Sequence, residues 1–433
     1  MSSSSTTPSS TGSTQWSTVS SQVAQSIEQA IQEASAELRA VSLDIHSHPE
    51  LGWEEHHAHD ALTEFMEKQG FQVERHAYGM DTAWKATYEV GQGGRTIGFN
   101  SEMDALMGIG HACGHNLIAI SGCAAALGVA AALKKHNIAG KIVLLGTPAE
   151  EGGGGKTELL ALDAYKGMDA CLMIHPGTGG NGSGSVTSTS IVGFTVTYKG
   201  KSAHAGGAPE KGINALDAAV AAYVNISVLR QQVPGTNRIH GVIAGSENWS
   251  ANVIPGEAQL KYGVRAPTAR EVMDLVPRVL NCFKAAALSS GCTHEITISH
   301  AYLDLQPCTT LETAYQEFCK ERWGSEGYDV SDRTSISAST DFGDVTYHLP
   351  GLHPMFHLPN AHGGEFPPKA PEAHQAALKA ATGIAVVGAR IIVDGDFAQE
   401  TRTTWEKQMK DIESEKVIAN LKDLLAPYRK QRE

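Results

Sequence analysis

Short apolar runs alternate with helical segments along most of the chain. The runs at 141–146 and 170–174 are almost wholly apolar, which is typical of strands buried on both faces of a parallel sheet. A polar–apolar pattern predicts a helix over 19–40, and a long charged helix is expected from about Thr403. The pattern therefore predicts an α/β fold with a mostly parallel, covered sheet.

Residues 189–303 have a different pattern, which predicts a separate small domain inserted into the first. The expected elements are a strand at 191–198, a helix at 213–229, strands at 238–244 and 258–264, a helix at 271–288 and a strand at 294–302. This β-α-β-β-α-β order is that of a ferredoxin-like unit. We expect it to form a lid, while 19–188 and 304–433 form the main domain.

The longest apolar stretch, 117–133, is rich in alanine and contains no proline. Because Ser121 and several glycines interrupt it, and Lys134-Lys135 ends it, we interpret it as a buried core helix and not as a membrane span.

The composition and net charge argue against some classes of partner. The 433-residue chain has a net charge of -13, which argues against nucleic acid or an anionic membrane as its main partner. Residues 1–18 are rich in Ser and Thr and lack the basic and apolar regions of a secretory signal, so we expect a disordered tail. Seven scattered cysteines fit a reducing compartment, and the expected location is the cytoplasm.

Side chains that can bind a metal ion or transfer a proton follow three of the predicted strands. Asp104, the pair Glu150-Glu151 and His175 each stand at a strand's carboxyl end. Open α/β sheets bind ligands at that edge. One acid at a strand end means little, but this combination predicts a site.

The segment His111-Ala-Cys113-Gly-His115 sets three metal-binding side chains within five residues, just before the apolar helix. Thiolate and imidazole suit zinc and its neighbours in the first transition row. The alternative is that Cys113 is a small buried apolar residue and that both histidines are ordinary loop residues.

The other candidate site residues can also be explained without any catalytic or metal-binding role. One carboxylate of the Glu150-Glu151 pair can bind a cation while the other acts as general base, although most such pairs are solvated turns. His204, in a glycine-rich loop, can donate to an oxyanion or be an ordinary polar loop residue. His362 follows a predicted strand at 355–358 and is a further candidate ligand. The histidines that compete with it are His353, His357 and His374.

Six motifs together resemble the dinuclear metallopeptidases related to aminoacylase-1 and carboxypeptidase G. The Cys-Gly-His motif is similar to the amidohydrolase branch, which includes auxin-conjugate hydrolases, aminobenzoyl-glutamate hydrolases and Xaa-Arg-type dipeptidases. The matching segments are His46-Ser-His-Pro-Glu-Leu-Gly-Trp-Glu54, Glu102-Met-Asp104-Ala-Leu106, Gly110-His-Ala-Cys-Gly-His-Asn116, Pro148-Ala-Glu-Glu-Gly152, Gly200-Lys-Ser-Ala-His-Ala205 and Asn252-Val-Ile-Pro-Gly256.

The resemblance implies a role for each matching residue. It implies two divalent ions, zinc before manganese or cobalt, and a homodimer formed through the lid. The implied metal ligands are Cys113, His115, Glu151, His175 and His362. Glu150 falls on the general base, and Asp104 on an acid that we expect to support the site without binding metal directly. His204, Asn252 and Arg265 fall on lid residues that contact the substrate's oxyanion and carboxylate. The chain departs from the family pattern at Met107 and Gly363-Gly364.

The expected function is metal-dependent hydrolysis of the amide bond in an N-acyl amino acid or dipeptide. Two alternatives stay open from the sequence. The same site can form an amide bond in a biosynthetic pathway, or the chain can be a non-catalytic binding or regulatory homologue. The intact set of ligands with Glu150 argues against the second alternative.

Overall fold

The computed structural model describes residues 16–178, 182–245, 249–358 and 368–429. The first helix is longer than the sequence predicts, because α1 runs over Trp16–Ser47 and includes His46 in its last turn. Most of the expected N-terminal tail lies outside the described residues, and residues 16–18 already belong to α1.

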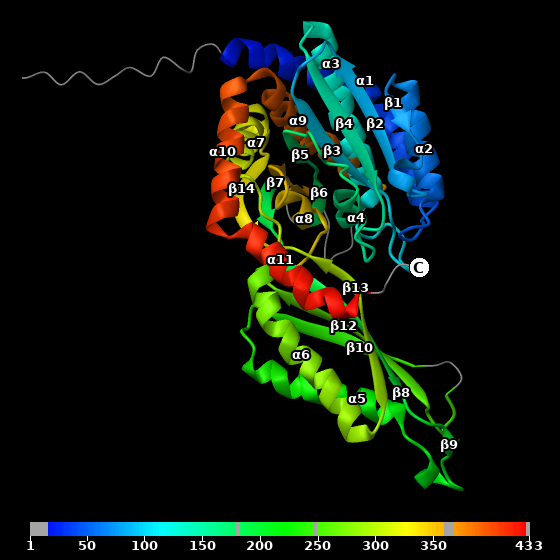
Figure 1. Cartoon of the computed structure of the whole chain (residues 1–433). Coiled ribbons are helices and arrows are strands. Elements are labelled where there is room, and N and C mark those ends of the chain that lie inside the picture. Colours follow the sequence, from blue (N-terminus) through cyan, green and yellow to red (C-terminus); the bar gives the residue numbers. More distant parts are fainter. Residues whose placement is uncertain (1–15, 179–181, 246–248, 359–367, 430–433) are drawn as a thin grey trace, which may run out of the picture.

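A six-stranded sheet forms the centre of the main domain (Figure 1). Its strands, in spatial order, are β1 (Gln72–Glu74), β2 (Trp84–Val90), β4 (Gly140–Thr147), β3 (Thr96–Glu102), β5 (Ala170–Leu172) and β15 (Gly351–Leu352). Strands β4, β3, β5 and β15 are parallel, as predicted, whereas β1 and β2 pair antiparallel at one edge. A short connection between β1 and β2 permits this antiparallel pairing, because only parallel neighbours need a long crossover.

A second, smaller sheet lies beside the first. Its order is β14 (Asp329–Ser335), β7 (Gly182–Thr187), β16 (Pro354–Leu358) and β6 (His175–Thr178). The helices of the main domain, besides α1, are α2 (His56–Lys68), α3 (His115–His136), α4 (Gly155–Ala161), α7 (Thr309–Trp323), α8 (Phe342–Thr346), α9 (Pro371–Val393), α10 (Gly395–Asp411) and α11 (Ser414–Leu425).

Helix α3 is the buried core helix that the apolar run predicts. A side chain at Gly122 would meet Ser101 Oγ at 2.4 Å, and one at Gly128 would meet Ile27 at 2.8 Å. Small residues therefore let α3 pack closely against β3 and α1. Helices α3 and α9 are long and apolar enough to span a membrane, but 94% and 78% of their apolar windows are buried within the protein.

The C-terminal region contains two helices instead of the single long helix expected. Glu413 adopts a left-handed φ of 50° between α10 and α11. The Arg270 guanidinium, from the lid, donates a hydrogen bond to the Ile412 carbonyl at 2.9 Å and also bonds the Glu413 carboxylate. These bonds satisfy the end of α10 and stabilise the break.

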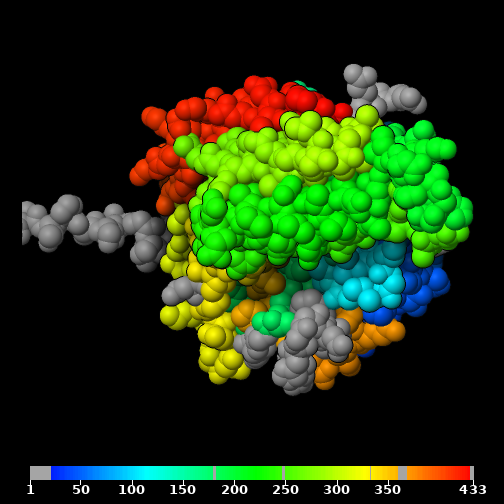
Figure 2. Space-filling view, turned by 90° about the horizontal axis from the view of Figure 1, so that it is seen from below, coloured from blue at the N-terminus to red at the C-terminus, as the bar shows by residue number. Residues whose placement is uncertain are grey.

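Residues 190–302 form the lid, a four-stranded antiparallel sheet with two helices against one face. The order is β10 (Arg238–Ala244), β12 (Glu257–Ala266), β8 (Ser190–Lys199) and β13 (Thr293–Tyr302), with α5 (Ala215–Leu229) and α6 (Ala269–Ser290). This is the predicted β-α-β-β-α-β unit, and its elements differ from the predicted ones by at most two residues at each end. Viewed from below, the lid lies across the main domain (Figure 2).

Candidate metal centre

The carboxyl ends of three neighbouring strands carry the core of the site. Asp104 follows β3, Glu150 and Glu151 follow β4, and His175 follows β5. Because β4, β3 and β5 are adjacent and parallel, these ends meet at one edge of the sheet. This arrangement is the one the sequence predicts.

The Cys113 turn brings two further donors to that edge. Cys113 Sγ lies 3.3 Å from His175 Nε2, and one donor atom from each of Cys113, His115 and His175 lies within 4.8 Å of the others. Gly114 makes the turn possible, since its φ is 83° and a side chain there would come within 2.7 Å of Pro176. Cys113 and His175 are thus held together across 62 residues of sequence.

Asp104 orients His115 and does not join the donors itself. His115 is fully buried, and its Nδ1 lies 3.1 Å from Asp104 Oδ1. The other oxygen of Asp104 accepts a hydrogen bond from the Glu151 amide at 2.9 Å. A carboxylate that binds one ring nitrogen leaves the other nitrogen to a metal ion. This geometry fits the supporting role expected for Asp104.

His115 Nε2 supplies the clearest sign that a cation belongs here. This buried nitrogen has no hydrogen-bond partner among the described residues. It lies 3.5 Å from Glu102 Oε2, 3.7 Å from Glu151 Oε1 and 3.9 Å from Glu150 Oε2. Buried polar atoms are rarely left without a partner, and a divalent ion among these groups would satisfy all of them. The donor set of thiol, imidazole and carboxylate therefore fits a transition-metal centre.

The backbone is strained at Ala149, directly before the two glutamates, whose side chains differ in exposure. Ala149 has a φ of 54°, and its amide donates to the Glu55 carboxylate at 2.7 Å. A left-handed conformation at a residue other than glycine persists only where neighbours hold it. The Glu150 side chain is 8% exposed and that of Glu151 is 25% exposed, so the pair divides into an inner and an outer carboxylate.

Burial controls the charges in the cluster. It raises the pKa of Glu150 well above its usual value, and the nearby Glu102 and Asp341 carboxylates raise it further. Burial also raises the pKa of the Cys113 thiol to about 12. Burial alone would lower the pKa of His115, but Cys113 and Asp104 raise it well above normal. A metal ion that binds here must therefore displace protons from Cys113 and His115.

The predicted lid residues separate into two groups. His204 Nε2 lies 3.3 Å from Asn252 Nδ2, where β9 (Ala203–His204) pairs with β11 (Val253–Ile254). Strand β9 lies at the tip of the lid, far from β3 and β4 of the same chain (Figure 1). Arg265 lies instead at the base of the lid, 3.2 Å from Ser339 Oγ of the main domain. Burial lowers the pKa of Arg265, and the charges of Glu150 and Glu151 partly oppose this shift.

The histidines of the C-terminal region lie in different surroundings. His362 lies outside the described residues. His374 is buried in α9, where its Nε2 lies 3.1 Å from Ser35 Oγ in α1, and it is not part of the donor cluster. His353, which the sequence offers only as a competitor, is buried against His175 with ring centroids 5.9 Å apart. Burial lowers the pKa of His353 to about 3, so the ring is neutral.

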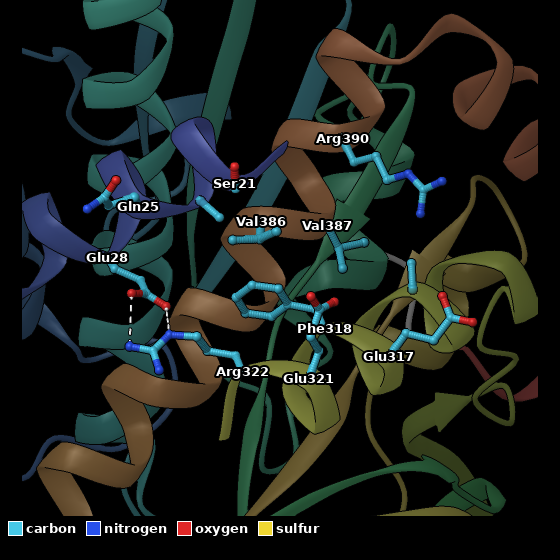
Figure 3. Close-up of a pocket in the computed structure, with 12 residues that line it drawn as sticks. Ser21, Gln25, Glu28, Glu317, Phe318, Glu321, Arg322, Val386, Val387 and Arg390 are labelled. Atoms are coloured by element: carbon cyan, nitrogen blue, oxygen red, sulfur yellow. Dashed lines mark hydrogen bonds and ion pairs between the residues drawn. The ribbon is translucent and has the colours of Figure 1, made fainter. Parts of the chain in front are cut away.

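A cavity of about 640 Å³ lies between α1, α7 and α9 (Figure 3). Arg322 Nε pairs with Glu28 Oε1 at 2.7 Å on its wall, and Phe318 and Val386 supply apolar surface. None of the residues lining the cavity belongs to the donor cluster. The metal centre is therefore the better candidate for catalysis.

Comparison with known proteins agrees with this geometry. A protein-family model described as "Peptidase dimerisation domain" matches residues 186–290. The chain is 43% identical to the Xaa-Arg dipeptidase of Homo sapiens, over 74% of this chain and 76% of that protein. It is 31% identical to a p-aminobenzoyl-glutamate hydrolase polypeptide of Escherichia coli, over 66% of this chain and 63% of that protein.

A solved structure shares the fold. The crystal structure of a dinuclear metal binding peptidase of the M20 family from Bacillus subtilis superimposes with a TM-score of 0.59 at 18% identity, covering 83% of this chain and 99% of that chain. Fold, donor cluster and relatives define a hydrolase of the amidohydrolase and dipeptidase class. The chain belongs to the M20 peptidase family.

Proposed function

We propose that this protein hydrolyses the amide bond of an N-acyl amino acid or dipeptide with a metal-activated water. The observation that carries the proposal is the buried Glu150 carboxylate beside the unpartnered Nε2 of His115. Two divalent ions, most readily zinc, would be held by Cys113, His115, Glu151 and His175, with His362 as a fifth ligand from the family resemblance. The thiol favours zinc, and manganese and cobalt are the alternatives.

In this proposal each residue of the site has its own role in the hydrolysis. Bound divalent ions supply Lewis acidity and lower the pKa of water. Glu150 takes the proton of the attacking water, and the same carboxyl group protonates the leaving amine. Arg265 binds the substrate's carboxylate, and His204 with Asn252 stabilises the developing oxyanion. Asp104 holds His115 in the orientation that metal binding needs.

The relatives support this substrate class by the names they bear. One acts on Xaa-Arg dipeptides and another on p-aminobenzoyl-glutamate, and both compounds join an amino acid through an amide bond. A panel of N-acyl amino acids and dipeptides, assayed for release of the free amino acid, tests the proposal. Hydrolysis of at least one class is expected. Net amide synthesis from free acid and amine, without hydrolysis, would favour the biosynthetic alternative.

We also infer a cytoplasmic homodimer formed through the lid. All seven cysteines are free thiols. Strand β10 is an unpaired edge of the lid sheet, and exposed edges tend to pair with another chain. The neighbouring apolar side chains are also exposed, as at a subunit interface. They are Val220, Tyr223, Val224 and Val228 of α5 and Val242 of β10.

Pairing of two β10 edges would also complete the site. Arg238, opposite Arg265 in the sheet, marks the base end of β10, and Ala244 marks the tip end. Antiparallel pairing of β10 with its copy sets the base end of one chain beside the tip end of the other. The tip carries His204 and Asn252. This symmetry supports a site in which the partner supplies His204 to the cleft beside Arg265.

Val224→Glu is expected to give a monomer with greatly reduced kcat, because a charge in the α5 face opposes its burial. Light scattering after gel filtration measures the mass. Leu288→Glu is the matched control, since Leu288 is 84% exposed on α6, outside the proposed interface.

Mixing inactive His204→Ala and Glu150→Gln dimers should restore activity, because one cleft of the mixed dimer has both residues. Proven heterodimers without activity would contradict the trans arrangement.

A further inference from the structure

A buried ion cluster outside the predicted ligand set adjoins the metal centre. Glu102, the last residue of β3, and Lys156, in the first turn of α4, are both fully buried. Lys156 Nζ donates to Glu102 Oε1 at 2.7 Å and to Asp341 Oδ1 at 2.6 Å. Burying three charged groups is costly unless they are closely paired, so this cluster must hold its members in fixed positions.

The two acids of the cluster differ in how completely they are bonded. Both oxygens of Asp341 are used by Lys156, because Oδ2 also accepts the Lys156 backbone amide at 2.9 Å. Glu102 uses Oε1 alone. Its Oε2 is buried and has no hydrogen-bond partner among the described residues. An unbonded carboxylate oxygen in the interior calls for a partner.

That oxygen faces a nitrogen of the metal centre that also has no hydrogen-bond partner among the described residues. Glu102 Oε2 lies 3.5 Å from His115 Nε2, closer than any oxygen of Glu150 or Glu151 to the same atom. Both side chains are fully buried, and each is fixed by a hydrogen bond at its other polar atom. His115 Nδ1 is bonded to Asp104, and Glu102 Oε1 is bonded to Lys156. Two donors converge in this way where one ion is to bind both.

We propose that Glu102 supplies a further carboxylate oxygen to the metal centre through Oε2, and that Lys156 is the positioning residue that holds it there. This inference rests on the proposed function. The glycine-rich turn before Lys156 brings the lysine to this place, since Gly155 is close-packed and a side chain there would meet the Pro148 carbonyl at 1.9 Å. In the rival explanation Glu102 serves only to balance the charge of Lys156.

Zinc binding by the metal-stripped dimer, followed by calorimetry, distinguishes the two explanations without any substrate. Glu102→Gln should bind one ion at least about tenfold more weakly than the unaltered protein, the lower end for loss of a metal-site partner. Asp341→Asn removes the other partner of Lys156 and should keep the affinity within about threefold. Asp304→Asn, which alters a buried carboxylate that accepts a hydrogen bond from the Ala269 amide at 2.8 Å, controls for burial and should also leave the affinity unchanged.

A conservative variant keeps the test decisive if Glu102→Gln does not fold. Glu102→Asp retains the charge that pairs with Lys156 but shortens the reach by one methylene, so it should weaken zinc binding while circular dichroism stays native. Unchanged affinity in Glu102→Asp and Glu102→Gln, or equal losses in Glu102→Gln and Asp341→Asn, would overturn the proposal. Zinc binding that depends on Glu102 in a protein that cleaves no amide would instead contradict only the proposed function.

Discussion

Glu150→Gln is expected to lower kcat on the order of 100-fold or more while the metal content stays at the wild-type level. The amide keeps the shape of the side chain but cannot take a proton from water. Burial and the charges of Glu102 and Asp341 raise the pKa of Glu150, which suits a group that accepts a proton and returns it to the leaving amine. Steady-state kinetics and metal analysis on the same preparation measure both effects.

The position of Glu150 makes this prediction specific. Its side chain is the more buried of the glutamate pair, and its carbonyl is fixed by the Tyr302 hydroxyl at 2.9 Å. Glu151→Gln is the matched comparison, because loss of the outer carboxylate should reduce metal binding as well as kcat. A fully active Glu150→Gln enzyme would refute the role of general base, and loss of metal from that variant would make Glu150 a ligand instead.

Cys113→Ala is expected to lose most of the bound metal and, with it, most of the activity. Cys113 Sγ lies beside His175 Nε2, and no other thiol is part of a donor cluster among the described residues. Metal analysis after dialysis against a weak chelator measures the loss. Cys123→Ala is the control, since Cys123 is a buried thiol of α3 that belongs to no donor cluster among the described residues. Wild-type metal content in Cys113→Ala would remove Cys113 from the ligand set.

Periodicity was sufficient to predict the elements of the lid and the sheet edge at which the donor side chains meet. The lid strands alternate and its helices are capped by local signals, such as Thr268 with Glu271 at the start of α6, so each element is encoded within its own segment. Strand ends predict convergence because parallel strands share an edge, and this general rule brought Asp104, Glu150 and His175 together. These inferences needed no knowledge of long-range contacts.

Features that depend on distant segments could not be predicted in this way. The Glu102–Lys156–Asp341 cluster joins residues separated by 54 and 185 positions, and no local pattern links them. The break at Glu413 depends on Arg270 of the lid. The separation of His204 from the donor cluster of the same chain depends on how the lid is oriented against the main domain, which no local pattern determines. The four glycines at 152–155, directly before Lys156, are compatible with a close approach of the backbone, but they do not identify its partner.

Zinc titration of the metal-stripped protein, with dipeptide or N-acyl amino acid hydrolysis followed at each addition, tests the central claim most directly. We expect no turnover without metal and a rise in activity that saturates at two ions per chain. The same titration of Cys113→Ala should show no saturable rise in that range. Full hydrolysis by the metal-free protein, or none at any zinc concentration on the whole substrate panel, would contradict the proposed metal-dependent hydrolysis.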